Sequence, residues 1–233
     1  IKLEDKLDEP SKSLLTRSVN TIVTQVQALK TLINEFRDFS RMPSAKLVPI
    51  DINELINDVL ALYGHAIEQG TLIVELGREL PEIMGDATLL RQVVHNLVQN
   101  ALDAIGEHQP AHEAPRVLIR TDAPLKEDGS VRAVRLIVRD NGPGFPDKIL
   151  MRAFEPYLTT KNKGTGLGLA VVKKIADEHG ALVRLRNFND GNDSIPKSSS
   201  ELGYPSQVHT VRGAQVSLSF SKLSSKSAQA GSH

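Results

Sequence analysis

Four short clusters of polar residues and glycines follow one another along the chain, at 96–100, 140–144, 154–161 and 164–168. The first carries two asparagines four residues apart, and the second and fourth are rich in glycine. Side-chain oxygens can complete the coordination of a magnesium ion that phosphates and water otherwise hold. Glycine-rich turns that open a helix present free backbone N–H groups to anions. In this order the clusters predict a binding site for ATP and magnesium.

Asn96, Asn100 and Asp103 belong to a helix that we expect at 86–105. Their spacing places the three side chains within about 60° of one another, at the border of a wide apolar side of the helix. An asparagine pair alone is more often a solvated helix surface than a set of ligands. The motifs that follow in the chain favour ligands that point into a cleft.

Asp140 follows an expected strand at 131–139 and begins a turn that contains Gly142 and Gly144. A carboxylate at the end of a strand can accept a hydrogen bond from an exocyclic amine such as that of adenine. The two glycines let the backbone approach a flat ring because they carry no Cβ. An ordinary hairpin turn is the alternative interpretation, since Asp-Asn-Gly is common turn chemistry.

The segment 164–168 opens an expected helix at 166–179, so its backbone N–H groups and the positive helix end face outward. It is not a Walker loop, because no Gly-Lys-Ser/Thr follows, and its spacing differs from the dinucleotide-binding fingerprint. Glycines that allow tight helix packing are the alternative. Lys161 adds positive charge where a γ-phosphate would lie, and the stretch 143–165 is typical of a mobile lid.

Hydrophobic periodicity and turn residues predict the elements that position these clusters. We expect helices at 51–70, 86–105 and 166–179. We expect strands at 71–76, 117–121, 131–139, 182–188 and 214–220. Because hairpins interrupt the alternation of strands and helices, the pattern favours an α+β fold, an α/β sandwich in which helices cover one face of a mixed sheet.

A long helix at 11–42 precedes this domain. Its apolar residues recur at steps of three and four from Leu15 to Phe36, which is typical of a coiled coil or a helical bundle, so the stripe needs a partner helix. We expect a partial dimerisation region at 1–44, a linker at 45–49, an ATP-binding domain at 50–223 and a disordered tail at 224–233.

The composition argues against several classes of protein. The net charge is zero, so we expect no nucleic-acid partner. The chain has no cysteine, which excludes disulfides and thiolate metal sites. None of the seven histidines lies in the first 64 residues. We expect His95 and His179 at the surface or as supports of the site.

The ordered clusters resemble the nucleotide-binding boxes of sensor histidine kinases, which are members of the Bergerat-fold (GHKL) ATPases. The resemblance covers about 50–220. The segments 100–105 and 154–161 are similar to the nitrogen-regulation branch, the NtrB- and NtrY-like kinases. The helix at 11–42 is similar to the second dimerisation helix of the NtrY-like members.

This resemblance implies a role for each cluster. Asn100 would bind magnesium, Asn96 would contact a phosphate, and Asp140 would accept a hydrogen bond from adenine. The other residues that it places at the ATP are Asp103, Gly142, Gly144, Thr160, Lys161, Gly164, Thr165, Gly166, Leu167 and Gly168.

The chain departs from the family pattern in three ways. The phospho-acceptor motif, a His-Glu followed by an Asn-Pro, is absent, so we expect this chain to bind Mg-ATP without phosphorylating itself. Asp103 and Ala104 stand where many kinases carry a lysine and a tyrosine, and 189–212 is a long polar insertion.

Relatives that hydrolyse ATP place a carboxylate one turn before the magnesium asparagine, where this chain has Asn96. An amide cannot act as a general base. We therefore expect a kinase that donates the γ-phosphoryl group to a histidine. A degenerate binding or dimerisation module and a hydrolysing ATPase are the alternatives.

The resemblance also implies partners. The phosphorylated histidine would pass its group to an aspartate on a response regulator of the NtrX/NtrC type, and the full-length protein would be a homodimer. The chain has no apolar run of about 18 residues. We expect it to be a cytoplasmic portion, in a protein that can be anchored in the bacterial inner membrane.

Overall fold

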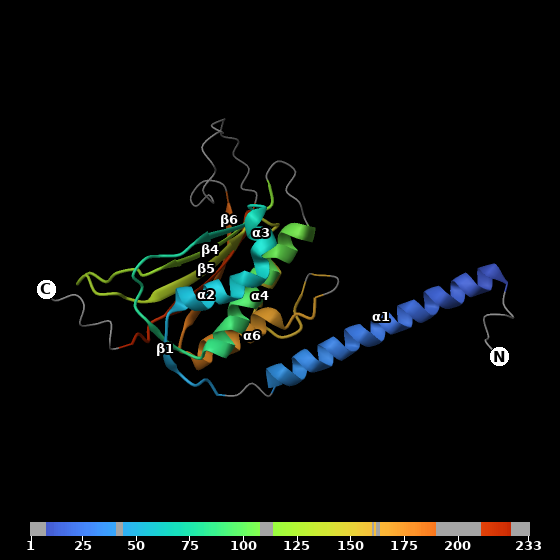
Figure 1. Ribbon diagram of the computed structural model, residues 1–233, viewed down its shortest axis with the longest axis horizontal. Coiled ribbons are helices and arrows are strands. Elements are labelled where there is room, and N and C mark those ends of the chain that lie inside the picture. The colour runs from blue at the N-terminus through green and yellow to red at the C-terminus, as the bar shows by residue number, and fades with distance from the viewer. Residues whose placement is uncertain are drawn as a thin grey trace. The chain divides into compact units, whose positions relative to one another are not determined.

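The computed structural model describes residues 8–40, 44–107, 114–159, 161, 164–189 and 211–224. The chain forms two compact units, Ile1–Pro43 and Ser44–His233. Figure 1 shows both units. Residues 190–210 of the expected insertion at 189–212, residues 225–233 of the expected tail at 224–233, and Thr160 lie outside the described residues.

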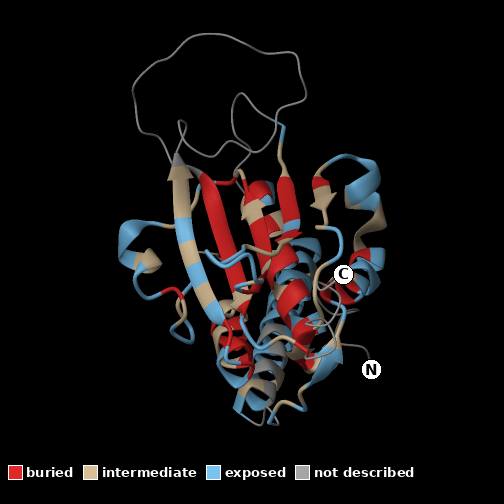
Figure 2. Cartoon of the chain, turned by 90° about the vertical axis from the view of Figure 1, so that its left-hand side faces the viewer, coloured by how far each residue is buried: buried red, intermediate tan, exposed pale blue. Residues whose placement is uncertain are grey.

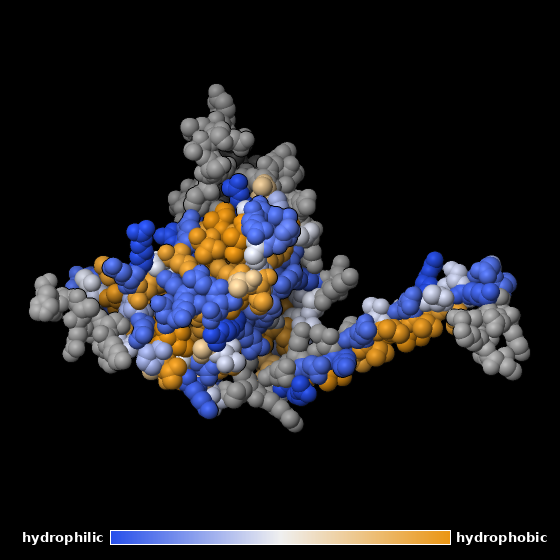
Figure 3. Space-filling model, viewed as in Figure 1, coloured by the Kyte–Doolittle hydropathy of each residue, from blue (hydrophilic) through white to orange (hydrophobic). Residues whose placement is uncertain are grey.

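The first unit contains one long helix, α1 (Glu9–Ser40), of 32 residues. The Asp8 carboxylate accepts a hydrogen bond from the Ser11 N–H at 3.3 Å, which satisfies one of the unpaired donors at the beginning of the helix. The expected apolar stripe is exposed: Ile22 and Val26 keep 62% and 59% of their surface. Figure 3 shows it as an orange band along one side of α1.

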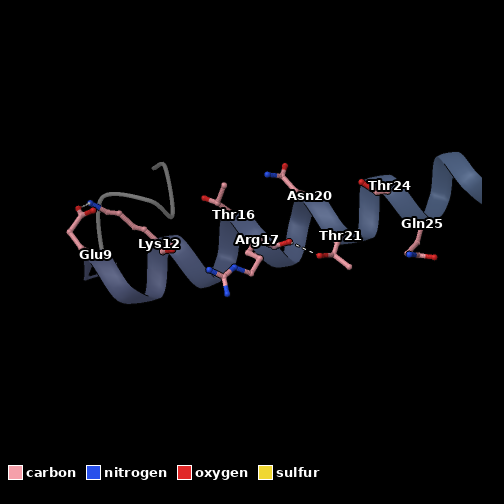
Figure 4. Close-up of a pocket in the computed structure, with 9 residues that line it drawn as sticks. Glu9, Lys12, Thr16, Arg17, Asn20, Thr21, Thr24 and Gln25 are labelled. Carbon is pink, nitrogen blue, oxygen red and sulfur yellow. Dashed lines mark hydrogen bonds and ion pairs between the residues drawn. The ribbon is translucent and has the colours of Figure 1, made fainter. Parts of the chain in front are cut away.

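The opposite side of α1 is polar. Figure 4 shows a shallow hollow on this helix, and all nine residues that line it belong to α1. A hollow with walls from a single helix cannot enclose a ligand, so this is a hydrated helix surface. Its lining residues are Glu9, Lys12, Ser13, Thr16, Arg17, Asn20, Thr21, Thr24 and Gln25. None of the helices in the described part of the chain is long and apolar enough to cross a membrane.

The second unit is built on a five-stranded sheet in the order β2-β4-β5-β7-β6. Its strands are β2 (Leu72–Glu75), β4 (Val117–Asp122), β5 (Val134–Asp140), β6 (Leu182–Asn189) and β7 (Val211–Phe220). The pair β2–β4 is parallel and the other three pairs are antiparallel. The sheet is therefore mixed, as the sequence predicted.

Three helices, α2 (Ile52–Leu60), α4 (Ala87–Glu107) and α6 (Gly168–Glu178), lie on one side of this sheet (Figure 1). Side chains of β5 alternate accordingly: Val134, Leu136 and Val138 are at most 3% exposed and face the helices. Apart from Phe220, the core between helices and sheet is aliphatic, because the chain has few aromatic residues. Buried residues (red in Figure 2) gather along these strands and helices.

Several elements differ from the expected ones. The helix expected at 51–70 is divided into α2, a 3₁₀ turn (Ala61–Tyr63) and α3 (Gly64–Glu68), consistent with the low helix propensity of glycine at 64. Strand β1 (Val48–Ile50) includes part of the stretch expected as a linker and pairs with β3 (Ile83–Gly85). A short helix, α5 (Asp147–Leu150), lies within the expected lid.

One contact fixes the two helices of the site to each other. The Asp86 carboxylate accepts hydrogen bonds from the N–H groups of Thr88 and Leu89, at 3.0 and 3.2 Å, and so caps α4. The Asp86 N–H donates to His179 Nε2 at 2.9 Å. His179 Nδ1 therefore carries the proton and donates it to the Ile175 carbonyl at 2.7 Å. His179 is 1% exposed, so it is a structural core residue.

Candidate nucleotide site

The two asparagines of α4 face the beginning of α6. Asn96 Nδ2 donates to the Gly168 carbonyl at 3.5 Å. A Cβ on Gly168 would lie 3.1 Å from Asn100 Nδ2, so glycine is what lets α6 begin this close to α4. Both asparagines are half-buried at the border of the core. This is the position that their spacing predicts, and it joins the first cluster to the fourth.

Lys161 joins the third cluster to α4. Its ammonium group lies 3.2 Å from Asn100 Oδ1 and 2.8 Å from Asp103 Oδ2. The second Asp103 oxygen accepts a hydrogen bond from Gln99 Nε2 at 2.7 Å. The lysine side chain is 21% exposed, so the pair is partly shielded from water. Asn100 Oδ1 thus points toward a positive charge. An amide oxygen in this orientation is also a suitable ligand for magnesium, which binds oxygen atoms.

Asp140 is a buried carboxylate at the end of β5, with 8% of its surface exposed. Burial raises its pKa from 3.8 to about 6, against the opposing effect of hydrogen bonds from the backbone of Gly142 and Ala214 and of the Lys161 charge. The Gly142 N–H donates to Asp140 Oδ1 at 2.9 Å. A Cβ at Gly142 would lie 3.2 Å from atoms of Ala104 on α4, so this turn packs closely against the helix.

A backbone contact joins Tyr157, within the segment expected to form a lid, to Gly166 just after that segment. Gly166 has a φ of +72°, and a Cβ there would lie 2.6 Å from the Tyr157 carbonyl carbon. The Tyr157 N–H donates to the Gly166 carbonyl at 3.1 Å, and Tyr157 itself has a positive φ of 67°. Only glycine fits at 166 without displacing the lid backbone. This contact joins the two sides of the expected lid.

Other expected site residues have structural contacts. Leu167 is 1% exposed, so its side chain belongs to the core and only its backbone can meet a ligand. Thr165 Oγ1 accepts a hydrogen bond from the Leu167 N–H at 3.5 Å. Gly144 has a φ of +71°, and a Cβ at Gly164 would lie 2.8 Å from Thr159 Oγ1.

Two further asparagines hold the loops of the site in place, and neither was expected. Asn141 Oδ1 accepts a hydrogen bond from the Arg116 N–H at 2.7 Å, which ties the turn to the beginning of β4. Asn187 on β6 bonds both the N–H and the carbonyl of Phe145, at 2.8 and 2.6 Å. Asn141 lies within the second cluster and could have been found there. Asn187 lies inside a strand and has no sequence signal.

Gly213 on β7 completes this end of the sheet. A Cβ there would lie 2.0 Å from the Asp140 carbonyl oxygen, and its φ is +152°. Any other residue would push β7 away from the end of β5 that carries Asp140.

The donor set fits a magnesium ion held mainly by phosphates. The structure contains no group of three histidine, cysteine or acidic residues suited to a metal ion within its described ranges. Magnesium usually keeps several water molecules and takes only one or two protein oxygens beside substrate phosphates. One amide oxygen on Asn100 therefore suffices. The 11 residues of α6 begin without a side-chain cap, which leaves its first N–H groups available to phosphate oxygens.

The family described as histidine kinase-, DNA gyrase B-, and HSP90-like ATPase matches residues 85–222. These residues include every cluster of the site and more than half of the chain. The chain belongs to this family, which confirms the Bergerat-fold resemblance.

Within this family, the chain is similar to proteins of nitrogen regulation. Nitrogen regulation protein NtrY of Azorhizobium caulinodans is 33% identical over 183 residues, which are 77% of this chain and 23% of that protein. Sensory histidine kinase/phosphatase NtrB of Rhizobium leguminosarum bv. phaseoli is 30% identical over 173 residues, 72% of this chain and 45% of that protein. The chain thus spans less than half the length of these relatives.

A solved structure shares the fold. The nucleotide-free catalytic domain of histidine kinase ThkA is 27% identical, with a TM-score of 0.54, over 76% of this chain and 96% of that one. The five-stranded mixed sheet with helices is therefore the architecture of histidine kinase catalytic domains.

The buried position of Asp140 predicts a pH dependence. Because its folded pKa of about 6 lies above 3.8, the folded state holds a proton that the unfolded chain releases. The free energy of unfolding should fall by up to about 3 kcal/mol as pH rises from about 4 to about 6, and stay level above. Asp140→Asn should lose this slope. Urea unfolding of both proteins at several pH values measures it, and equal slopes would contradict the assignment.

The ion pair between Lys161 and Asp103 predicts that the lid is restrained before nucleotide binds. Asp103→Asn should increase hydrogen exchange at the backbone amides of 154–159 about two- to fivefold, since a partly exposed pair contributes about 0.5–1 kcal/mol. Asp58→Asn is the matched control, because it removes the Arg91–Asp58 pair elsewhere on the domain. Equal exchange in the two variants would show that the pair does not restrain the lid.

Proposed function

We propose that this chain is the ATP-binding catalytic region of a sensor histidine kinase. It would donate the γ-phosphoryl group of ATP to a histidine, from which the group passes to an aspartate on a response regulator. The observation that carries the proposal is Asn96, an amide one turn before Asn100 that contacts the beginning of α6. An amide can orient a ligand but cannot remove a proton from water. Without a general base to activate water, the bound ATP is not hydrolysed and its γ-phosphoryl group can be transferred to another nucleophile.

In this proposal each cluster has one task. Asp140 accepts a hydrogen bond from the adenine amine, and the turn at 142–144 lies along the ring. The first N–H groups of α6 bind phosphate oxygens. Asn100 supplies one oxygen to the magnesium ion, whose charge, with that of Lys161, offsets the charge on the phosphates. Positioning and charge neutralisation supply most of the catalysis in phosphoryl transfer.

Lys161 would change partners when nucleotide binds. Its ammonium group contacts Asn100 Oδ1 and Asp103 Oδ2. In this proposal it occupies the position that the magnesium ion would take beside Asn100. Magnesium would displace it from Asn100, and the γ-phosphate would attract it. We propose that this exchange couples nucleotide binding to the lid.

We propose that the acceptor histidine lies on a helix that packs against the apolar side of α1. The helix α1 contains no histidine, and its stripe from Leu15 to Phe36 is exposed. A stripe of this length is typical of a helical bundle, so we also propose that the full-length protein is a homodimer. The relatives named NtrY and NtrB suggest a response regulator of the NtrX/NtrC type as partner. The supply of ATP suggests a cytoplasmic site of action for this region, below a membrane anchor.

Loss of the magnesium ligand should weaken nucleotide binding. Asn100→Ala is expected to lower the affinity for Mg-ATP at least about tenfold, while binding in excess chelator changes little, because only the metal-bound form uses this oxygen. Calorimetric titration measures both. Asn57→Ala, at an exposed position on α2, is the matched control. An unchanged affinity for Mg-ATP would refute the metal site.

The unaltered chain should bind ATP without hydrolysing it. With γ-labelled Mg-ATP it is expected to form no acid-labile phosphohistidine and to release phosphate at the background rate. Asn96→Glu places a carboxylate at the position of a general base, and should raise phosphate release about tenfold or more. Asn57→Glu controls for the added charge. Steady phosphate release by the unaltered chain would instead assign a hydrolysing ATPase, and failure to bind ATP would assign a binding module.

A further inference from the structure

The segment 44–50, through which the chain enters the second unit, is bound directly to the beginning of α4. We call it the entry segment. Its strand β1 pairs with β3, with Val48 opposite Gly85. Strand β3 ends at Gly85, and Asp86, the residue that caps α4, follows at once. Just before β1, the Lys46 N–H donates to Asp86 Oδ2 at 3.1 Å.

The two oxygens of the Asp86 carboxylate have separate roles. Oδ1 accepts the N–H groups of Thr88 and Leu89 and so caps α4, whereas Oδ2 accepts the N–H of Lys46. The Asp86 N–H donates to His179 Nε2 at 2.9 Å, and His179 is the residue at which α6 ends. Asp86 therefore joins three parts of the domain: the entry segment, the beginning of α4 and the end of α6.

Gly85 allows these three parts to pack against one another. A Cβ at this position would meet one side chain from each part: Leu90 at 2.6 Å, Ile50 at 3.4 Å and His179 at 3.5 Å. Leu90 and His179 are each 1% exposed. Because a protein interior is closely packed, a displacement of one part has no void to absorb it and shifts the others.

The same two helices carry the candidate nucleotide site at a second place. The helix α6 begins at Gly168, beside Asn100 of α4, and ends at His179, beside Asp86. The 11 residues of α6 span about 16 Å. A helix of this length is stiff, so a change in the contact between α4 and α6 at one end alters their arrangement at the other.

We infer that Asp86 is a positioning residue that couples the entry segment to the nucleotide site. The Lys46–Asp86 hydrogen bond and the bound nucleotide favour the same arrangement of α4 and α6. This inference rests on the proposed function, which places the nucleotide between these helices. Coupling between two sites is reciprocal: a nucleotide that strengthens the hydrogen bond is itself bound more tightly, by the same factor, when the bond is made. The entry segment follows α1 in the chain, so the coupling provides a route from α1 to the nucleotide.

The first test needs no nucleotide. Lys46→Pro removes the N–H that Asp86 accepts, while the matched control Lys46→Ala removes the side chain and keeps the N–H. Hydrogen exchange at the amides of 169–173, in the first turns of α6, should rise about two- to fivefold in Lys46→Pro, because the helix pair loses one of its contacts. Lys46→Ala should exchange like the unaltered chain.

The second test uses Mg-ATP and calorimetric titration. Asp86→Asn keeps an oxygen for the cap of α4 but replaces the acceptor of the Lys46 N–H by an amide NH₂. Its affinity for Mg-ATP should fall about two- to fivefold, and Mg-ATP should slow exchange at 46–50 of the unaltered chain by the same factor. The matched control is Asp51→Asn, because Asp51 caps α2 through Oδ1 alone. Its affinity should be unchanged.

Three outcomes would overturn the inference. They are unchanged exchange at 169–173 in Lys46→Pro, equal Mg-ATP affinities of Asp86→Asn and Asp51→Asn, and binding of Mg-ATP without slower exchange at 46–50. Failure to bind Mg-ATP would refute the proposed function, whereas the test without nucleotide still decides the coupling. Circular dichroism detects a lost fold, and if Lys46→Pro does not fold, exchange at 169–173 in Asp86→Asn against Asp51→Asn decides instead.

Discussion

The close approach of α4 to the beginning of α6 is the constraint on which the candidate nucleotide site depends. Gly168 allows it because a Cβ there would press on the Asn100 amide at 3.1 Å. At the opposite ends of the same helices, His179 joins the end of α6 to the cap of α4 through the Asp86 N–H. Contacts at both ends therefore hold the two helices together. As a result Asn100 and Gly168, which are 68 positions apart in the chain, lie next to each other.

The parts of the fold that depend on neighbours in sequence could be predicted. The caps of α2 and α4 by Asp51 and Asp86 are of this kind, because a cap needs only the N–H groups two and three residues ahead. Helix geometry alone places Asn96, Asn100 and Asp103 on the same side of α4. The mixed sheet with helices on one face followed from the order of strands and hairpins.

What remained unpredicted depends on tertiary contacts. The pairing of β1 with β3 joins segments 35 residues apart, and three-residue strands leave almost no periodic signal. His179 is buried because the end of α6 packs against the beginning of α4, and nothing near it in the chain indicates this. The sequence placed Lys161 near a phosphate but gave no sign that Asp103 would hold it in the absence of one.

Two neighbouring residues at the end of β5, Arg139 and Asp140, point to opposite faces of the sheet. Asp140 faces the helices and the candidate nucleotide site, while Arg139 faces the opposite side of the sheet and shares Gln215 with Arg186. This follows from strand alternation, so a shift of register by one residue would exchange the two faces. Gly213, which holds β7 against β5 at this end, protects that register.

The hydrogen bond between Tyr157 and Gly166 has an entropic consequence for the lid. It closes the chain between these residues into a loop of only eight intervening positions. Closing a loop removes part of the configurational entropy of the chain, at a cost that grows only slowly with loop length, so a short closed loop has fewer arrangements left to lose than an open segment. Ordering this segment around a ligand therefore costs less than ordering an open strand of the same composition, and more of the contact free energy remains as affinity.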